Sequence, residues 1–252
     1  MTSPTAGIVI IGNEILSAKL PDANGPYLLR ALRARGLVVE EMRLIADSIP
    51  TIATAVTELA THNTHVFTTG GIGPTHDDLT VAGVARAFDV PVIRDPQLED
   101  ALRQFYGAQL TAAHLKMAEV PQGAEVIPSR QGYVPTVRMH NVVILPGVPA
   151  LMRRCFEQAT EHLKGPEVFS RAILLWSNES DVAELLAQVQ NAHPEVAIGS
   201  YPRFDTPDYR VKVTVDGCDA GGVDAACHDL LQQLPTAAVA GEEPPRSSST
   251  VG

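Results

Sequence analysis

The sequence is poor in cysteine and contains no long apolar run. Its three cysteines, Cys155, Cys218 and Cys227, show no CxxC spacing. This argues against a disulfide framework or a zinc site, and we expect buried or half-buried structural thiols. No run approaches the roughly 18 apolar residues of a membrane-spanning helix. Residues 1–4 lack the basic and apolar features of a secretory signal, so we expect a cytoplasmic protein with no membrane partner.

Positive charge is also scarce. The chain has 19 Lys and Arg residues against 29 Asp and Glu residues, which gives a formal net charge of −10. A surface that binds nucleic acid needs a basic patch to release counterions, so we expect no nucleic-acid partner. The 252 residues are 45% hydrophobic and 19% charged, a composition typical of a globular protein with a sizeable core. This length fits one large domain, or one domain with a small companion.

Short apolar runs alternate with helical patterns in the N-terminal part of the chain. The predicted strands are residues 7–11, 37–44, 66–69, 126–127, 133–139 and 141–145. Helices are predicted at residues 26–35 and 48–62, between the first three strands. Strands that alternate with helices are typical of a doubly wound, mostly parallel α/β sheet. In such a sheet, ligands bind beyond the carboxyl ends of the strands.

A glycine-rich loop follows the predicted strand at residues 66–69. Gly70, Gly71 and the Gly73-Pro74 turn precede Thr75, and a helical pattern begins soon afterwards. In a strand, glycine turn and helix start, backbone N–H groups and a helix N-terminus point at an anion. Both GK[ST] and GxGxxG are missing, so this loop is neither a P-loop nor a Rossmann fingerprint. The alternative is an ordinary β–α turn capped by an aspartate.

Acidic residues accompany this loop. Asp77 and Asp78 lie within it, and Asp47 follows the second predicted strand. Adjacent carboxylates repel an anion unless a divalent cation lies between them, so the pair predicts a metal such as Mg²⁺, Mn²⁺ or Co²⁺. Asp47 is alternatively a turn residue before Ser48. His76 stabilises phosphate, assists proton transfer or is a solvated loop residue.

Other predicted site residues also follow strands. Gly12, Asn13 and Glu14 come directly after the first strand. Together with Asp47 and residues 70–78, which follow the second and third strands, they are expected to converge at the carboxyl ends of the strands. Pro146 and Gly147 form a rigid turn that either lines this site or ends a strand. The predicted ligand-binding residues are Gly12, Asn13, Glu14, Asp22, Asn24, Thr69, Gly70, Gly71, Gly73, Pro74, Thr75, His76, Pro146 and Gly147.

Four segments occur in the order found in a known family: Gly12-Asn13-Glu14-Ile15-Leu16, Asp22-Ala23-Asn24, the loop TTGGIGPTHDDLT at residues 68–80, and Leu145-Pro146-Gly147-Val148-Pro149. Together they resemble the molybdopterin-binding (MoCF) domain family. The resemblance is closest to the N-terminal region of CinA-type competence/damage-inducible proteins and to the matching region of eukaryotic FAD synthases. It runs from about residue 7 to about residue 234 and implies a MogA-like fold and a homo-oligomer.

The resemblance also implies roles for individual residues. Asp47 and Asp78 match functional aspartates of the family, so we predict Asp47, Asp77 and Asp78 as catalytic and Asp47 and Asp78 as metal ligands. Asp22 and Asn24 match the family's Asp-Thr-Asn, as ligand contacts or as helix caps. Asn13 stands where the family usually has aspartate, which puts a metal or base role at that position in doubt.

The pattern changes after a boundary near residue 166. We predict a MoCF domain at residues 1–166, a small α+β domain at 167–238 and a disordered Pro/Ser-rich tail at 239–252. The β-α-β-β-α order of the small domain resembles the KH-like middle domain of CinA-type proteins. It lacks the GxxG loop with which KH domains bind nucleic acid.

The predicted ligand is a small molecule that carries phosphate. The resemblance implies metal-dependent hydrolysis of a nucleotide pyrophosphate of the ADP-ribose or FAD type. One alternative is a molybdopterin-binding protein of molybdenum-cofactor metabolism, and another is a catalytically silent binding module, which Asn13 favours. Whether the protein is an enzyme stays open. The resemblance includes neither the deamidase domain of CinA proteins nor the adenylyltransferase part of FAD synthases, so we expect neither activity.

Overall fold

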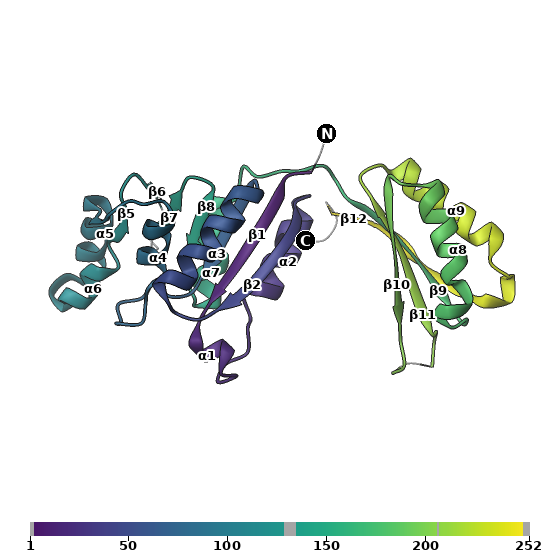
Figure 1. Ribbon diagram of the computed structural model, residues 1–252, viewed down its shortest axis with the longest axis horizontal. Coiled ribbons are helices and arrows are strands. Elements are labelled where there is room, and N and C mark those ends of the chain that lie inside the picture. Colours follow the sequence, from purple (N-terminus) through teal and green to yellow (C-terminus); the bar gives the residue numbers. More distant parts are fainter. Residues whose placement is uncertain (1–2, 129–134, 206, 249–252) are drawn as a thin grey trace. The chain divides into compact units, whose positions relative to one another are not determined.

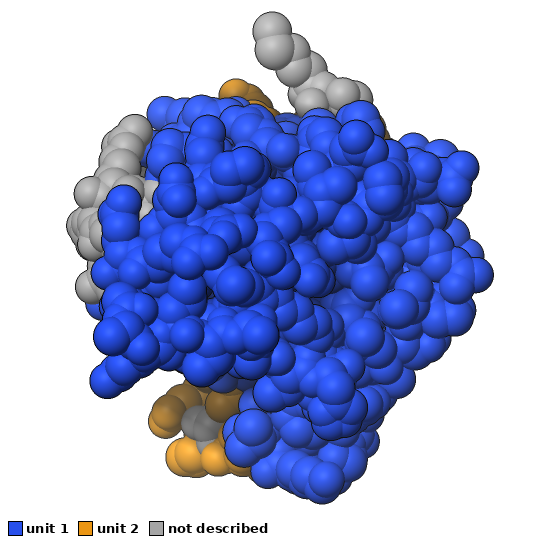
Figure 2. All heavy atoms as spheres, turned by 90° about the vertical axis from the view of Figure 1, so that its left-hand side faces the viewer, with its two compact units in different colours: residues 1–32, 37–164 blue, residues 33–36, 165–252 orange. Residues whose placement is uncertain are grey.

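The computed structural model describes residues 3–128, 135–205 and 207–248 (Figure 1). The chain divides into two compact units, which Figure 2 distinguishes by colour. Unit 1 comprises Met1–Leu32 and Leu37–Lys164, and unit 2 comprises Arg33–Gly36 and Gly165–Gly252. None of the helices in the described ranges is both long enough and apolar enough to cross a membrane.

Unit 1 is built on a six-stranded sheet with the order β2-β1-β3-β8-β7-β6. Neighbouring strands among β2, β1, β3 and β8 pair in parallel, whereas β7 and β6 are antiparallel. The strands are β1 Thr5–Ile11, β2 Val38–Ile45, β3 His65–Thr69, β6 Glu125–Ile127, β7 Thr136–Met139 and β8 Val142–Leu145. The predicted mostly parallel α/β sheet is therefore confirmed. Residues 133 and 134 of one predicted strand lie outside the described residues.

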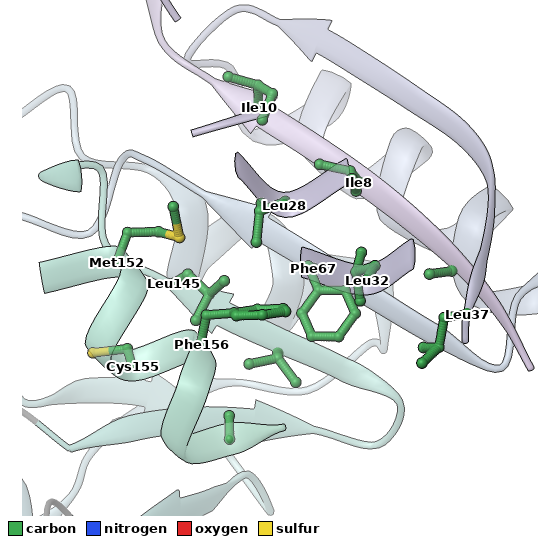
Figure 3. Packing of buried hydrophobic residues seen from close by; sticks show 13 residues of the cluster. Ile8, Ile10, Leu28, Leu32, Leu37, Phe67, Leu145, Met152, Cys155 and Phe156 are labelled. Atoms are coloured by element: carbon green, nitrogen blue, oxygen red, sulfur yellow. The ribbon is translucent and has the colours of Figure 1, made fainter. Parts of the chain in front are cut away.

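Helices cover both faces of this sheet, because successive side chains of a strand point to opposite faces. On one face, Ile8 and Ile10 of β1 pack with α2 (Gly25–Ala34) and α7 (Pro149–Ala159). Figure 3 shows this cluster, in which the Phe67 and Phe156 rings meet edge to face with centroids 5.4 Å apart. On the other face, Val9 packs against the apolar sides of α3 (Ile49–His62) and α4 (Thr80–Ala87). The fold is thus a doubly wound three-layer sandwich.

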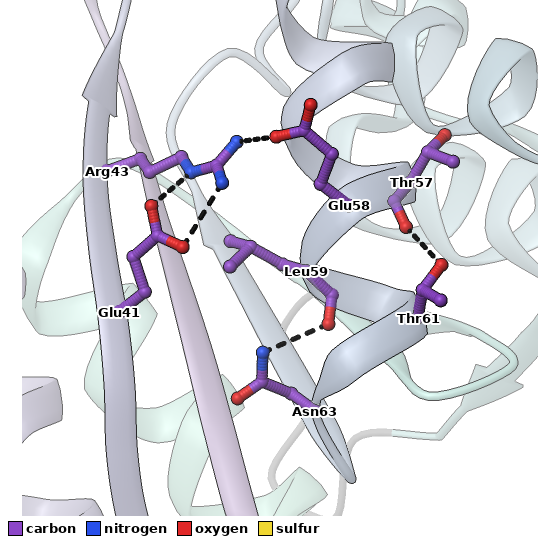
Figure 4. A network of polar contacts seen from close by, with 7 residues as sticks. All are labelled: Glu41, Arg43, Thr57, Glu58, Leu59, Thr61 and Asn63. Carbon is purple, nitrogen blue, oxygen red and sulfur yellow. Dashed lines mark hydrogen bonds and ion pairs between the residues drawn. The ribbon is translucent and has the colours of Figure 1, made fainter.

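Strand β2 forms one edge of the sheet, and an ion-pair network links it to α3 (Figure 4). The Arg43 guanidinium donates to both Glu41 oxygens, at 2.6 and 3.1 Å, and also to Glu58 of α3. Glu41 and Glu58 are exposed and Arg43 is half-buried, so the network contributes only modestly to stability. Its effect is to attach the edge strand to α3, the helix that carries Glu58.

An excursion between α4 and β6 forms a small subdomain of unit 1. It comprises β4 Val92–Arg94, α5 Pro96–Tyr106, a 3₁₀ turn Gly107–Gln109, α6 Ala112–Lys116 and β5 Glu119–Pro121. The Asp95 and Thr111 side chains cap α5 and α6. A separate apolar cluster around Leu98 and Val120 gives this excursion its own small core.

Unit 2 is an α+β domain with an antiparallel sheet of order β10-β11-β9-β12. Its elements are β9 Phe169–Leu175, α8 Glu179–Ala192, β10 Val196–Pro202, β11 Val211–Gly217, α9 Ala220–Gln233, a 3₁₀ turn Thr236–Ala238 and β12 Val239–Ser247. Both α8 and α9 contribute to one apolar cluster with the sheet. The second, smaller domain is therefore present. The prediction that all three cysteines are at least half-buried is wrong for Cys218, which is exposed.

The predicted disorder is wrong for residues 239–247, because β12 pairs along β9. Val239 packs against the core of unit 2, and Arg171 and Lys212 form ion pairs with Glu242 and Glu243, each at 2.7 Å. The prolines at positions 244 and 245 coincide with a break in the β12–β9 register, and edge strands tolerate proline at such irregular positions. Residues 249–252 lie outside the described residues.

We predict that deleting residues 239–252 destabilises unit 2, because the deletion uncovers β9 and removes two ion pairs. The midpoint of thermal unfolding should fall by about 10 °C, as expected for a loss of a few kcal/mol in a domain of this size. Calorimetry tests this against a control that lacks only residues 249–252. Equal midpoints for the two truncations would show that β12 adds nothing to stability.

Candidate functional site

Four parallel strands end side by side, and the predicted site residues follow them. The pairing of Ile11 with Ile45, Ile10 with Thr69 and Thr69 with Leu145 aligns these ends. The structure therefore places at one edge of the sheet the segments that follow: Gly12 to Glu14, Asp47, residues 70–78, and Pro146 with Gly147. Glu14 lies in a short helix, α1 (Asn13–Leu16). In α/β sheets this edge is where ligands bind.

The glycine loop approaches the end of β1 so closely that side chains are excluded. Gly70 has φ +100°, and a Cβ there would lie 2.0 Å from the carbonyl oxygen of Ile11. Gly71 has φ +63°, and its Cβ would lie 2.5 Å from Thr80 Oγ1. Thr80 is fully buried. Its hydroxyl donates to the Gly70 carbonyl at 2.7 Å, and its N–H donates to the Gly71 carbonyl at 2.9 Å. The start of α4 is thereby fixed to the loop.

Five backbone N–H groups of this loop have no hydrogen-bond partner in the described part of the chain. They belong to Gly71, Ile72, Gly73, His76 and Leu79. Backbone N–H groups are obligatory donors, and successive unpaired donors in a glycine turn form a concavity that attracts anions. The loop therefore has the donors that a phosphate group requires.

The two aspartates of the loop are bound within it. Asp78 Oδ2 accepts the Thr75 N–H at 2.8 Å, and the Thr75 hydroxyl donates to Asp78 Oδ2 at 2.5 Å or to Asp77 Oδ1 at 2.6 Å. The residue that caps α4 is Leu79, without a side-chain bond, so the alternative of an aspartate cap is wrong. The hydrogen bond from Thr75 lowers the pKa of Asp77, and its own backbone N–H adds to this. His76 is 97% exposed and lies 3.9 Å from Asp77, as expected of a solvated loop residue.

Asp47 lies near other negatively charged side chains. Its Oδ2 accepts the backbone N–H of Asn13 at 2.7 Å. Burial raises the pKa of Asp47, and the nearby Glu14 and Asp77 carboxylates raise it further, whereas the bond from Asn13 lowers it. Asn13 thus contacts Asp47 through its backbone N–H, which any residue type except proline could provide.

The carboxylates fit a divalent cation only in part. In the ranges that the structure describes, no group of three or more His, Cys, Asp and Glu side chains could hold a metal ion by itself. Asp47 and Asp78 supply hard oxygen donors, which suit Mg²⁺ or Mn²⁺, and Mg²⁺ commonly takes its remaining ligands from water and substrate phosphate. Metal binding here would therefore depend on the ligand.

Asp22 and Asn24 have structural contacts. The Asp22 carboxylate accepts the N–H groups of Asn24 and Gly25 at 2.9 and 3.0 Å, which caps α2. Asn24 is buried and donates from Nδ2 to Thr69 Oγ1 at 3.0 Å and to the Gly147 carbonyl at 2.8 Å. The Thr69 hydroxyl in turn donates a hydrogen bond to the Pro146 carbonyl at 2.8 Å. Asn24, Thr69 and Pro146 therefore brace the turns that carry the site.

Lys116 is a loop contact that sequence reasoning missed. It is the last residue of α6, and its Nζ donates to the carbonyl oxygens of Thr75 and, at 3.0 Å, of Asp78. Nothing in the sequence links Lys116 to the glycine loop, because Lys116 belongs to an excursion with its own small core.

Unit 2 has a groove of its own. It measures about 550 Å³ and lies between α8 and the edge strand β10. Gln190 of α8 accepts the Ile198 N–H and donates to the Val196 carbonyl, both at 2.8 Å. These bonds satisfy the open strand edge, so at this end the groove is a helix–sheet junction.

The fold and the loop define a doubly wound α/β domain with its candidate ligand site at the carboxyl ends of the strands. Residues 7–165 match the family described as a probable molybdopterin binding domain, and the chain belongs to this family. Residues 167–243 match the middle domain of FAD synthase. The two matched segments meet between residues 165 and 167.

Individual relatives agree with these matches. A protein of Archaeoglobus fulgidus is 33% identical, over 90% of this chain and 96% of its own length. A probable FAD synthase of Caenorhabditis briggsae is 29% identical over 84% of this chain, which spans only 46% of that protein. The crystal structure of the protein CinA, of unknown function, from Thermoplasma acidophilum is 28% identical with a TM-score of 0.59. It covers 64% of this chain and 99% of its own.

We predict that Gly70→Ala disrupts the loop more than a glycine substitution in open space does. Gly123 has φ +86°, and a Cβ at that position would have nothing within 4 Å, so Gly123→Ala isolates the backbone strain, which costs about 1–2 kcal/mol. Gly70→Ala adds the collision with Ile11 and should cost about 1–3 kcal/mol more. Urea denaturation of both variants measures this difference, and equal losses would contradict the close approach.

We predict that Asp47→Asn stabilises the protein at neutral pH. The raised pKa of Asp47 means that its charged form disfavours folding, so its contribution to stability is present below the unfolded pKa of about 4 and is lost as pH rises through the folded pKa. Asparagine keeps an oxygen acceptor for the Asn13 N–H. The gain in free energy of unfolding should therefore be present at pH 7 and shrink towards pH 4. Denaturation at both pH values, with Asp89→Asn as control, tests this; a loss of stability at pH 7 would show that the charge is compensated.

Proposed function

We propose that the protein binds the pyrophosphate group of a nucleotide such as ADP-ribose or FAD at the glycine loop and hydrolyses it with the help of a divalent cation. The unpaired N–H groups of Gly71, Ile72, Gly73, His76 and Leu79 carry this proposal. They are donors without a protein acceptor in the described residues, at the sheet edge where ligands of this fold class bind. The family of the chain and its likeness to a probable FAD synthase support a ligand of this kind.

The acidic residues give the loop a second property. Asp47 and Asp78 would hold the cation, which when bound supplies charge neutralisation and a more acidic water molecule. The loop N–H groups bind and orient the phosphoryl oxygens, where charge increases during hydrolysis. Asp77, whose pKa is lowered by Thr75, stays ionised at neutral pH and can orient the attacking water as a hydrogen-bond acceptor, while the proton of the water passes to solvent. In hydrolysis, the water oxygen bonds to phosphorus as the anhydride bond breaks.

A second candidate function is molybdopterin binding without hydrolysis. The description of the family favours this pterin ligand, whose phosphate would use the same loop. The position of Asn13 favours the absence of catalysis, because its amide side chain adds no charge to the Asp47 cluster. Both functions use the same N–H groups, so turnover separates them.

A homo-oligomer is part of the proposal. Edge strand β2 exposes the apolar side chains of Val38, Met42 and Leu44. Exposed apolar side chains along a strand edge are a common basis for association between copies of a chain.

We predict that hydrolysis of ADP-ribose or FAD is abolished by EDTA and restored by Mg²⁺, Mn²⁺ or Co²⁺. Asp78→Asn should lower kcat/KM by about 10²-fold, the usual effect of removing one transition-state contact, because it removes a cation ligand while keeping an oxygen acceptor for Thr75. Asp89→Asn, at the other end of α4, is the matched control and should behave as wild type. Full turnover in EDTA would contradict the metal role, and binding without turnover at saturating metal would favour the second candidate.

A further inference from the structure

Lys116 contacts the glycine loop through backbone oxygens. Its Nζ donates to the carbonyls of Thr75 and Asp78, and no bond to the carboxylates of Asp77 or Asp78 accompanies these contacts. An ammonium group has three donors, so one remains for another acceptor. No other cationic side chain in the described ranges hydrogen-bonds to residues 70–78.

These two bonds determine where neighbouring N–H groups point. In a trans peptide, the C=O of one residue and the N–H of the next point in opposite directions. Because Lys116 draws the carbonyls of Thr75 and Asp78 towards itself, it turns the N–H groups of His76 and Leu79 away. These are two of the five loop donors without a partner in the part of the chain that is described.

Lys116 is itself held in place by the excursion. A capping box between Thr111 and His114 starts α6, and the His114 ring stacks on Tyr106 with centroids 3.8 Å apart. Just beyond Lys116, Ala118 is buried in the small core of the excursion. The half-buried Lys116 side chain thus extends from a helix that is already fixed by packing, which limits the conformational entropy lost when the side chain is held at the loop.

We propose that Lys116 is the positioning residue of the phosphate site, which turns the N–H groups of His76 and Leu79 towards a bound phosphate and supplies a positive charge beside the loop. The inference rests on the proposed function, because it assigns a role at the same loop. A P-loop carries its lysine within the loop motif. Here a lysine from a different element takes that place, which accounts for a phosphate loop without a GK[ST] segment.

The experiment compares Lys116→Met, Lys116→Arg and the control Lys164→Met, a lysine at the end of unit 1. Inorganic pyrophosphate is titrated by calorimetry, and turnover of ADP-ribose and FAD is measured with Mg²⁺. Lys116→Met should weaken pyrophosphate binding on the order of 10-fold or more and raise KM. Lys116→Arg, which can still donate to both carbonyls, should recover most of the affinity. Thermal midpoints should stay within a few degrees of wild type.

A second readout separates positioning from a purely structural role. In amide NMR spectra, pyrophosphate should shift the His76 and Leu79 signals of wild type and leave those of Lys116→Met nearly unchanged. If Lys116→Met binds pyrophosphate as wild type does, the inference is overturned while the proposed function stands. If wild type binds in a Lys116-dependent way but hydrolyses nothing, the inference stands and the hydrolase proposal falls. If wild type does not bind pyrophosphate, both fall.

Discussion

The backbone of Gly70 against the carbonyl of Ile11 is the contact on which the site depends. A Cβ at this position would lie 2.0 Å from that oxygen. The chain can therefore pass this close to the end of β1 only if the residue after β3 is glycine. Once this approach is made, Thr80 bonds the carbonyls of Gly70 and Gly71 and fixes the start of α4. Loop, helix and first strand then form one unit, and the unpaired N–H groups of the loop have fixed directions before any ligand arrives.

The central sheet could be predicted from sequence because its parallel strands are buried on both faces. Such strands are continuous apolar runs, and residues 7–11 and 66–69 stand out for this reason. The strand β12 could not be predicted in the same way. Its Pro/Ser-rich composition is typical of disorder, and its partner β9 lies far away in the sequence. Only the fold shows that an irregular edge strand tolerates two prolines there.

The geometry of the candidate site was predictable where local sequence determines it and unpredictable where contacts are distant. Glycines between a strand and a helix require a tight turn, so residues 70–73 indicate a loop for an anion. The partners of polar side chains depend on the fold. Asp22 caps a helix, Asn24 bonds Thr69, and Asp47 accepts a backbone N–H from Asn13. Lys116 reaches the loop from an excursion that carries no motif.

The electrostatics of the site favour a division of labour between its acids. The pKa of Asp47 is raised by burial and by neighbouring charge, whereas the pKa of Asp77 is lowered by the Thr75 hydroxyl. Environments that shift the pKa values of two carboxyl groups in opposite directions are typical of sites where the two groups have different roles. Without a cation, the charge on Asp47 is a cost to folding, and a cation bound as proposed would turn the same repulsion into attraction. A cation and a phosphate ligand would then favour each other's binding, because each would relieve the charge that opposes the other.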